Sequence, residues 1–556
     1  MTNRMVEIHH GPYNNMEVWI ESYRNHIVHC SFYVSILMYC YDPLQQLLQQ
    51  SSSSSDEEIS DSTNPIFSWY FLLYGTITFL TTLALKAELV YIYLRHRLPP
   101  GNSGYPILGH FLVSIKGGPR ELVRDQIEKF GSPMVYNVLM QPVVMLSNDD
   151  DVTWWLLQER KGNTIGSIIP HLKKLFGDDA IIFLSGSYHK RLRRIFEPVF
   201  SPNAIRNYTQ RVDTMIKKHL QKWCGSYQSA QEWALLALRL FVACGFGDVK
   251  EELLQNLSEL FETWLMGFTA LHPFAIPGTI LYKAHQAKSE IFRLLKEMIN
   301  DFRTNNPPES DASKTTLMGR LCYTLDDNGN NMLSDQQLVD NIHLFLFAGH
   351  DTTKGSYGAF VHYLNKYPKI HNMLREEADT FSDPLHFDEL KSAPLLNAFM
   401  AETWRLIPPL HTHNTKAAKN FKYKGYYLPK GLKVSIDIQA YNIMNEKHFP
   451  EATEFHIERW IPPGHPLHDP YYYAKNVNHN LMSVTYRAFN AGSHMCLGSH
   501  FAKLEARVLL ARLLRSYDFT LRNERLLKFP LRQRLSEFKL VGRKRKTTGK
   551  NDEKNN

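Results

Sequence analysis

The sequence predicts a mainly α-helical domain with small β-sheets, preceded by an N-terminal membrane anchor helix. Three observations support this fold class. Amphipathic helical patterns dominate from about residue 100 to residue 541, where β-type stretches such as PMVYNVLM, PVVMLSN and KVSIDI are few and short. That long segment contains no internal repeat, so we expect it to form a single domain. Ahead of it stands an uncharged apolar run of the length that a membrane helix needs.

The apolar run comprises residues 66–85, and no Asp, Glu, Lys or Arg interrupts it. About twenty residues at ~1.5 Å each span the ~30 Å hydrocarbon core of a bilayer, so the run predicts a transmembrane helix. Acidic residues precede it, and basic residues such as Lys86 and Arg95 follow it. Because basic flanks tend to stay in the cytosol, we expect a single-pass protein of the endoplasmic reticulum membrane whose large C-terminal part faces the cytosol.

The remaining segments complete the predicted organisation. Residues 1–65 form an N-terminal extension, partly disordered because its Gln- and Ser-rich stretch cannot build a core. Within it, the shorter apolar run 27–41 is compatible with a second span, a targeting segment or an interfacial helix, and this choice stays open. Residues 86–109 form a linker with a proline-rich hinge, residues 110–541 form the main domain, and residues 542–556 form a basic, disordered tail.

Composition and charge exclude several classes of protein. A content of 44% hydrophobic and 21% charged residues is typical of a globular chain rather than a disordered one. The net charge of +8 is modest for 556 residues, and the basic residues are not gathered with aromatic ones, so we expect no nucleic-acid partner. The six cysteines include no C-x-x-C pair, which argues against a disulfide scaffold or a zinc site.

One cysteine has a neighbourhood unlike that of the others. Cys496 lies between Gly492 and Gly498 in the run FNAGSHMCLG, directly before an amphipathic helical pattern. Backbone N–H groups and a helix N-terminus favour a thiolate, which is a strong ligand for iron. The two glycines would let the backbone approach a flat macrocycle. Taken alone, however, this cysteine is more simply explained as a structural residue in a turn.

A second segment, NIHLFLFAGHDTTKGSYGAF, is very apolar yet holds an acid and hydroxyls at its centre. Ser334 and Gln337 form a capping-box pattern that predicts the start of its helix. Asp351 and Thr352 would be costly inside a buried helix unless they bond to something. They could pass protons into a groove, opened at Gly349, that holds dioxygen and water. Alternatively, Thr352 simply bonds to a carbonyl one turn earlier and bends the helix.

A third segment places Glu402 and Arg405 three residues apart on a predicted helix, where they can pair. Together and in this order, the three segments resemble the cytochrome P-450 superfamily, over about residues 97–540. The run 348–353 resembles the oxygen-activating stretch of the central helix. Glu402 and Arg405 match the E-x-x-R pair, and Arg459 in FHIERW resembles the arginine that completes a Glu-Arg-Arg triad. The run FNAGSHMCLG resembles the cysteine-ligand loop F-x-x-G-x-[HR]-x-C-x-G.

The resemblance implies a role for each matched residue. It implies a haem b cofactor (iron protoporphyrin IX) with a cysteine thiolate as the axial iron ligand. Asp351 and Thr352 would be catalytic, whereas Glu402, Arg405 and Arg459 would be structural. The residues expected to hold the cofactor, with Cys496 as the metal ligand, are Cys496, Arg193, His189, His494, Lys416, Phe489, Gly492 and Gly498.

Three of these positions depart from the commoner family pattern. His494 and Lys416 stand where many members carry arginine, and His189 stands where tryptophan is frequent. His494 and Lys416 can still bond to a haem propionate, but they lose the bidentate fork of a guanidinium. The departures therefore concern the geometry of propionate binding rather than haem binding itself.

Two further stretches narrow the branch of the superfamily. Residues 98–110 and 274–288 resemble segments of a branch with retinoic acid hydroxylases and plant oxidases of brassinosteroids and triterpenoids. The implied reaction inserts one oxygen atom from O2 into an apolar, isoprenoid-derived substrate: a sterol, triterpenoid, retinoid or carotenoid fragment. No segment resembles a flavin or nicotinamide domain. We therefore expect electrons from a membrane-bound NADPH-dependent reductase or a small electron-transfer haem protein.

Two alternatives stay open at this point. One is a thiolate-haem isomerase or dehydratase that acts on fatty-acid hydroperoxides without external electrons, although such relatives typically lack the acid–threonine pair. The other is a non-catalytic haem-binding or membrane interaction protein, although every motif position that the chemistry needs is filled.

Overall fold

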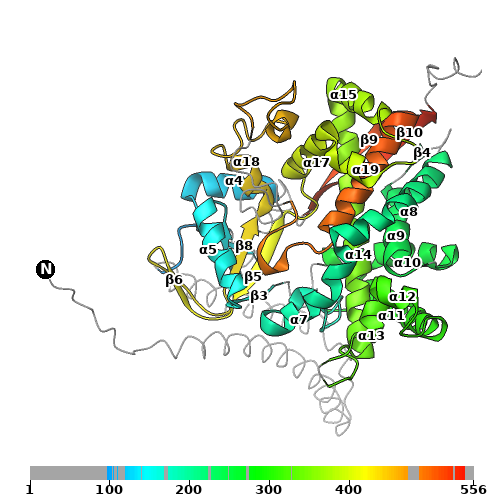
Figure 1. Cartoon of the computed structure of the whole chain (residues 1–556). Coiled ribbons are helices and arrows are strands. Elements are labelled where there is room, and N and C mark those ends of the chain that lie inside the picture. The colour runs from blue at the N-terminus through cyan, green and yellow to red at the C-terminus, as the bar shows by residue number, and fades with distance from the viewer. Residues whose placement is uncertain are drawn as a thin grey trace, which may run out of the picture. The chain divides into compact units, whose positions relative to one another are not determined.

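The computed structural model describes residues 97–544 apart from positions 103, 105–108, 111–118, 139–140, 168–172, 223–226, 229, 248, 271–273, 327, 474–487 and 530–531. These residues belong to one unit, and their fold is mainly helical with small β-sheets, as the sequence predicted (Figure 1). The predicted extension 1–65 with its apolar run 27–41, the predicted span 66–85 and most of the predicted tail 542–556 lie outside the described residues.

Helices make up most of the described chain. They are α4 Pro119–Phe130, α5 Asp149–Arg160, α7 Gly186–Phe196, α8 Pro202–Gln221, α9 Ala230–Gly245, α10 Glu251–Met266, α11 Ile280–Asn305, α12 Asp311–Thr315, α13 Leu317–Tyr323, α14 Asp335–Lys366, α15 Pro368–Asp379, α16 Phe387–Ser392, α17 Pro394–Leu406, α18 Ile438–Met444 and α19 Ser499–Ser516. Short 3₁₀ turns join some of them: η1 Ile181–Phe183, η2 Glu197–Phe200, η3 Gly267–Thr269, η4 Ile457–Trp460 and η5 Gly492–His494.

The β-strands form three small sheets. A five-stranded sheet has the order β1-β2-β8-β5-β3 and is antiparallel except between β2 and β8. Its strands are β1 Met134–Val138, β2 Gln141–Leu146, β3 Thr164–Gly166, β5 Thr412–Ala417 and β8 Lys433–Asp437. The other sheets comprise β4 Tyr227–Gln228 with β9 Tyr517–Phe529 and β10 Arg532–Lys544, and β6 Phe421–Tyr423 with β7 Tyr426–Leu428. The predicted β-type stretches correspond to β1, β2 and β8.

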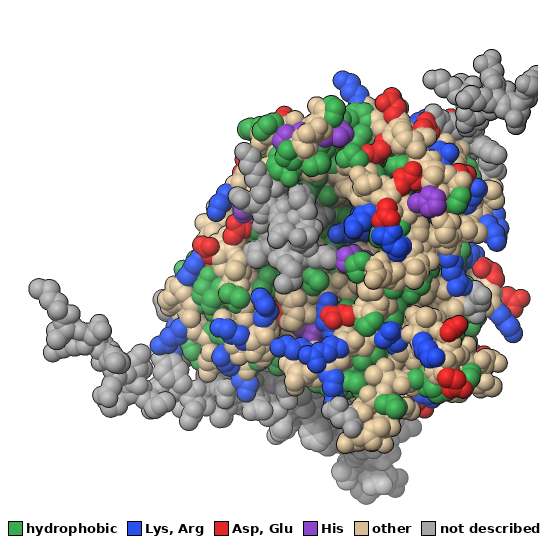
Figure 2. Space-filling view, viewed as in Figure 1, with side chains coloured by type: hydrophobic (Ala, Val, Ile, Leu, Met, Phe, Trp, Pro, Cys, Tyr) green, Lys and Arg blue, Asp and Glu red, His purple; other side chains and the backbone are tan. Residues whose placement is uncertain are grey.

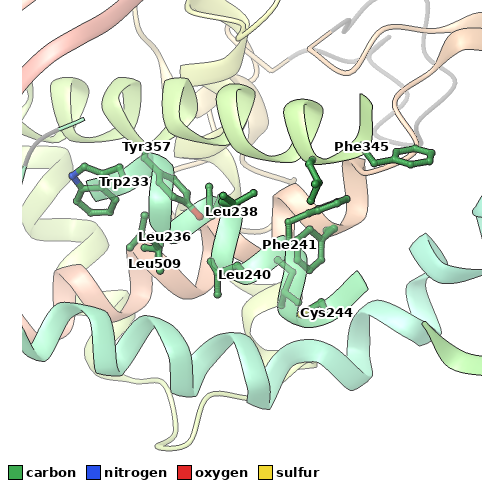
Figure 3. Close-up of a cluster of buried hydrophobic side chains, with 14 of the residues drawn as sticks. Trp233, Leu236, Leu238, Leu240, Phe241, Cys244, Phe345, Tyr357 and Leu509 are labelled. Atoms are coloured by element: carbon green, nitrogen blue, oxygen red, sulfur yellow. The ribbon is translucent and has the colours of Figure 1, made fainter. Parts of the chain in front are cut away.

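Helix α14 runs through the middle of the domain. The predicted capping box is confirmed: the Ser334 hydroxyl accepts a hydrogen bond from the Gln337 backbone N–H, and the Gln337 side chain accepts one from the Ser334 N–H. Helices α9 and α19 pack with α14 in the hydrophobic core, where Phe241, Tyr357 and Leu509 represent the three helices (Figure 3). Helix α9 is apolar around most of its circumference, so it is buried on nearly all sides.

Gly349 has a different role from the one expected. Helix α14 continues without interruption from Asp335 to Lys366, so Gly349 does not open a groove by breaking the helix. A Cβ atom at Gly349 would lie only 2.7 Å from Cδ2 of Phe241. The glycine therefore allows α14 to approach α9 closely, because hydrogen is the only substituent that fits beside the phenyl ring.

The predicted membrane location is not borne out by the described helices. None of them combines the length and the apolar character needed to cross a bilayer. Helix α9 is apolar but has only 16 residues, and α14 has 32 residues but carries His343, Asp351 and Lys354 in its interior. The prediction of a single-pass protein of the endoplasmic reticulum is therefore wrong for this part of the chain, and the run 66–85 on which it rested lies outside the described residues.

Candidate active site

A buried cluster of charges joins α17 to the segment around η4. Glu402, Arg405 and Arg459 are each 0% exposed. Arg405 donates two hydrogen bonds of 2.8 Å to the Glu402 carboxylate, and Arg459 Nε donates a third of 3.2 Å. Burial by itself would raise the pKa of Glu402, but Arg405 and Arg459 outweigh it and hold this pKa below its ordinary value. The structure thus brings together the three residues predicted to form the triad.

The loop with the unusual cysteine leads directly into α19. The Cys496 backbone N–H donates to the Phe489 carbonyl at 2.9 Å, which closes the loop. Gly492 has a φ of +76°, a left-handed conformation that favours glycine. Gly498 is the N-cap of α19, and its backbone N–H bonds to Cys496. The sulfur therefore lies at a helix N-terminus with a backbone donor directed at it, an arrangement that stabilises negative charge.

Two side chains around this loop connect it to the core. The Phe489 ring lies edge-on to that of Trp404, with centroids 5.0 Å apart. Lys503 Nζ lies 5.3 Å from the Phe489 ring centroid. Burial, followed by repulsion from Arg507, lowers the pKa of Lys503 to about 8, although the nearby Cys496 opposes this shift. Sequence reasoning missed Lys503, whose only signal is its place on the helix that follows the cysteine.

Arg193 of α7 holds the loop from one side. One of its terminal nitrogens donates to the Ser493 carbonyl at 3.1 Å and to the Met495 carbonyl at 2.7 Å. Its Nε donates to Glu197 at 2.8 Å. In Figure 1, the orange loop before α19 lies near α7, in keeping with these bonds. Arg193, one of the residues predicted to hold the cofactor, is therefore also tied to the backbone next to Cys496.

Glu159, in the last turn of α5, holds the same loop and was missed by the sequence analysis. It is only 4% exposed. Its Oε1 accepts hydrogen bonds from Ser493 Oγ (3.0 Å), the His494 backbone N–H (3.1 Å) and His494 Nδ1 (2.9 Å). Its Oε2 lies 2.8 Å from His413 Nε2. Burial would raise the pKa of Glu159, but His413 and His494 hold it far below its ordinary value.

The other predicted cofactor contacts lie around this network. His189 of α7 is buried, and its ring lies 4.3 Å from that of His494 between centroids. Burial, followed by repulsion from His494 and Arg193, lowers the pKa of His189 to about 4. Lys416 lies on β5, opposite Lys433 of β8. Burial, followed by repulsion from Lys416, lowers the pKa of Lys433 to about 8.

Part of the centre of α14 is not covered by other side chains. Ala348 is exposed and Thr352 is half-buried, whereas residues 338–347 and 356–361 are buried. The Thr352 hydroxyl donates to the Ala348 carbonyl at 2.6 Å, which is the local bond anticipated as an alternative. The Thr352 hydroxyl oxygen and the small Ala348 side chain therefore lie together on an uncovered stretch of α14, which is otherwise largely buried.

Asp351 belongs to a chain of ionisable groups that leads toward solvent. Asp351 and Lys354 are 2% and 5% exposed, and Lys354 Nζ lies 3.8 Å from Asp351 Oδ1. Lys354 Nζ also lies 2.5 Å from Glu262 Oε1 on α10, and the Glu262 side chain is 34% exposed. The sequence suggested Asp351 but gave no sign of Glu262, because the two positions meet only through the packing of α10 on α14.

A second buried acid bonds to α14 at Thr353. Glu505 of α19 is 1% exposed and shares a hydrogen bond with Thr353. Burial raises the pKa of Glu505 well above its ordinary value, so burial favours the protonated form of this carboxyl. Sequence reasoning missed it, although it is the single acidic residue of the amphipathic run FAKLEARVLLARLL.

Comparison with known proteins agrees with this architecture. The family model described as Cytochrome P450 matches residues 99–537. Putative cytochrome P450 120 of Synechocystis sp. is 28% identical over 76% of this chain and 91% of its own length. Abscisic acid 8'-hydroxylase 2 of Arabidopsis thaliana is 26% identical over 76% of this chain and 84% of its own, and taxane 13-alpha-hydroxylase of Taxus cuspidata is 25% identical over 79% and 90%.

A solved structure shows the same fold. The retinoic-acid-bound cyanobacterial CYP120A1 superposes with a TM-score of 0.68 at 24% identity, covering 81% of this chain and 99% of that one. The family and the fold together imply a haem with a cysteine thiolate as axial ligand. The chain therefore belongs to the cytochrome P450 family of monooxygenases.

Proposed function

We propose that Cys496 supplies the thiolate ligand of the haem iron, and that the enzyme inserts one oxygen atom from O2 into an apolar, isoprenoid-derived substrate. The setting of Cys496 carries this proposal. Its side chain is exposed by surface area, yet the pKa of its thiol is raised because the surrounding protein desolvates it. A side chain that is accessible but removed from water faces an interior space rather than bulk solvent.

The residues around that space fit a haem. The backbone N–H of Gly498 is directed at the sulfur, and Arg193 and Lys503 add positive charge near it. On α14, Ala348 carries no bulky side chain, and the helix is uncovered at this residue although residues 338–347 and 356–361 are buried. A flat macrocycle would cover both the exposed cysteine and this short stretch of helix.

The chain's own groups can deliver protons to the distal side. When bound, haem supplies the iron at which dioxygen is activated, and thiolate donation favours O–O cleavage. We assign Asp351 and Thr352 to proton transfer: Asp351 holds a proton at its carboxyl oxygen, and Thr352 Oγ1 passes it into the uncovered space. Lys354 and Glu262 connect Asp351 to the partly exposed side of α10, from which protons can be replaced.

We propose that cationic side chains and N–H donors beside the cysteine loop bind the haem propionates. Arg193 and Lys416 supply positive charge, and His189 supplies one N–H because its pKa of about 4 keeps it neutral. We keep His494 as a predicted propionate contact, on one condition. Its two ring nitrogens lie 2.9 Å from Glu159 and 3.0 Å from the Leu184 carbonyl, so a propionate would have to replace the Leu184 carbonyl.

The substrate class rests on the named relatives. Two of them are called hydroxylases of abscisic acid and of a taxane, which are isoprenoid-like compounds. The alternative of a hydroperoxide isomerase receives no support from these relatives.

Electrons would come from a separate NADPH-dependent reductase. Lys190, Arg191 and Arg194 are exposed on α7, the helix that also carries Arg193. Lys and Arg side chains gather over the region of α7 in the lower centre of Figure 2. A reductase with an acidic surface would be steered to this helix and so to the cysteine side of the haem.

The decisive experiment compares the haem-loaded protein with its Cys496→Ser variant. We expect the wild-type reduced protein with carbon monoxide to give the absorption band of a thiolate-ligated haem, and the variant to lose it because a hydroxyl is a far poorer anionic ligand. A variant with an unchanged spectrum would refute the ligand assignment. The substrate class is tested by titrating isoprenoid lipids and recording a spin-state shift, and then by detecting ¹⁸O from ¹⁸O2 in the product.

A further inference from the structure

The Glu159 carboxylate makes more hydrogen bonds to the cysteine loop than any local role in α5 requires. The helix is already well formed without it. The Asn148 side chain caps α5 by accepting from the Asp151 N–H at 2.9 Å, and acidic residues occupy its first turn. Glu159 instead points out of the last turn, and three donors from Ser493 and His494 converge on its Oε1.

The hydrogen-bond pattern fixes the direction of each bond. Both ring nitrogens of His494 face acceptors, Glu159 and the Leu184 carbonyl, so both carry hydrogen and donate. His413 uses Nε2 toward Glu159, and its Nδ1 lies 3.0 Å from Asn490 Nδ2, an amide donor. The two histidines thus place Glu159 at the centre of a network that reaches both ends of the turn 490–494.

Glu159 of α5 and Arg193 of α7 both hydrogen-bond to the cysteine loop. Arg193 donates to the carbonyls of Ser493 and Met495, whereas Glu159 accepts from the N–H and side-chain donors of Ser493 and His494. Gly492 makes the close approach possible: a Cβ atom there would lie 3.2 Å from Glu159 Oε1 and 3.2 Å from Leu156 Cδ2. The segment that ends one residue before Cys496 is therefore held between an acceptor on α5 and a donor on α7.

We propose that Glu159 is a positioning residue that fixes the loop 490–495 and thereby sets the place of the Cys496 sulfur on the haem iron. The proposal rests on Cys496 as the iron ligand. Without the carboxylate, Ser493, His494 and His413 would face a group that cannot accept all their bonds, and buried donors without acceptors are costly. The loop would relax, and the sulfur would lose its fixed distance from the iron.

The test uses Glu159→Gln in the full-length, haem-loaded protein. The amide keeps the shape but replaces one acceptor oxygen by a donor. Loss of a charge-assisted bond of this kind corresponds to about a tenfold change in equilibrium. We therefore expect about tenfold faster amide hydrogen exchange at His494, and a large fraction of the reduced, carbon-monoxide-bound protein at the band of a haem without thiolate ligation.

Matched variants separate positioning from general stability. Asp149→Asn makes the same carboxylate-to-amide change in the first turn of α5, where Asp149 pairs with His448 at 2.5 Å, and should leave both readings unchanged. Glu159→Asp should restore most of the thiolate band. If Glu159→Gln does not fold, Ser493→Ala takes its place, since it removes one of the three bonds to Oε1 and should give a smaller shift in the same direction.

The outcomes distinguish this proposal from the ligand assignment. If Glu159→Gln and Ser493→Ala keep the wild-type band and the wild-type exchange rate at His494, the positioning role is refuted while Cys496 remains the ligand. If the wild-type protein itself shows no thiolate band, the ligand assignment fails, and exchange at His494 still reports whether Glu159 holds the loop.

Discussion

Glu402, Arg405 and Arg459 carry three formal charges in a region that solvent does not reach. We predict that Arg405→Ala lowers the free energy of unfolding by about 3–5 kcal/mol. The substitution removes one of the two cationic partners of the buried Glu402 carboxylate, together with two of its hydrogen bonds. Urea unfolding followed by circular dichroism measures the change. Glu290→Ala removes an exposed partner of Arg293 and should leave the midpoint unchanged; an equal loss in both variants would contradict the prediction.

Glu505 gives a pH dependence with a definite sign. Its pKa in the folded protein lies well above the value of about 4.3 expected in the unfolded chain, so the folded state binds the extra proton. The stability that this proton contributes is present below the unfolded-state pKa of about 4.3, and it falls as pH rises from there toward the folded-state pKa. We predict that Glu505→Gln, which stays neutral, gains stability relative to wild type as pH rises from about 5 to 8. A constant difference in thermal midpoint over this range would speak against it.

The residues that the sequence predicted for the site and those that it did not reveal differ in one respect. Cys496, Asp351, Glu402 and Arg405 stand in short motifs, so their neighbours in sequence point to their chemistry. Glu159 meets its partners 334 and 335 residues away, and nothing in the run LLQER announces them. Glu159 gave no signal in the sequence because its partners are distant along the chain.

At the scale of elements, two of the three glycines of α14 have opposite environments. A Cβ atom at Gly349 would lie 2.7 Å from the Phe241 ring, whereas one at Gly355 would have nothing within 4 Å. We predict that Gly349→Ala destabilises the protein by about 1–3 kcal/mol through overpacking. Gly355→Ala should instead stabilise it by about 0.5–1 kcal/mol, because alanine is the better helix former. Chemical unfolding of the two variants tests both signs, and equal signs would contradict the packing argument.

Helix α14 also shows which structural features a sequence pattern can predict. Its capping box placed its start at Ser334 correctly, because that signal is local. The role of Gly349 was misjudged, because whether a glycine weakens a helix or admits a neighbour depends on Phe241, more than 100 positions earlier in the chain. The strands β1, β2 and β8 were likewise visible in the sequence, whereas their order in the sheet was not.

At the scale of the whole molecule, the sheet order β1-β2-β8-β5-β3 brings residues near 134–166 beside residues 412–437. This long-range pairing sets α5 against β5 (Figure 1). Trp155 Nε1 of α5 donates to Thr415 Oγ1 of β5 at 2.8 Å. It also places His413 of β5 on Glu159. Local propensity cannot specify such an arrangement, since it arises from the burial of both partners together.

The distribution of charge over the molecule predicts where the electron-donating reductase docks. Lys190, Arg191 and Arg194 are exposed on α7, one turn or less from Arg193, which contacts the cysteine loop. We predict that reversing Arg191 and Arg194 to glutamate slows haem reduction by an acidic reductase about tenfold or more at low salt, because electrostatic steering is lost.

Stopped-flow reduction under carbon monoxide at several ionic strengths measures this effect. The charge-reversed variant should lose most of the salt dependence of the wild type, since screening acts only on the attraction that has been removed. Lys296→Glu changes an exposed charge on α11 and serves as the control. Because Arg191 and Arg194 are exposed and Arg193, which holds the cysteine loop, is unchanged, the carbon-monoxide band should keep its position. A reduction rate that falls equally in the control would assign the effect to net charge rather than to docking at α7.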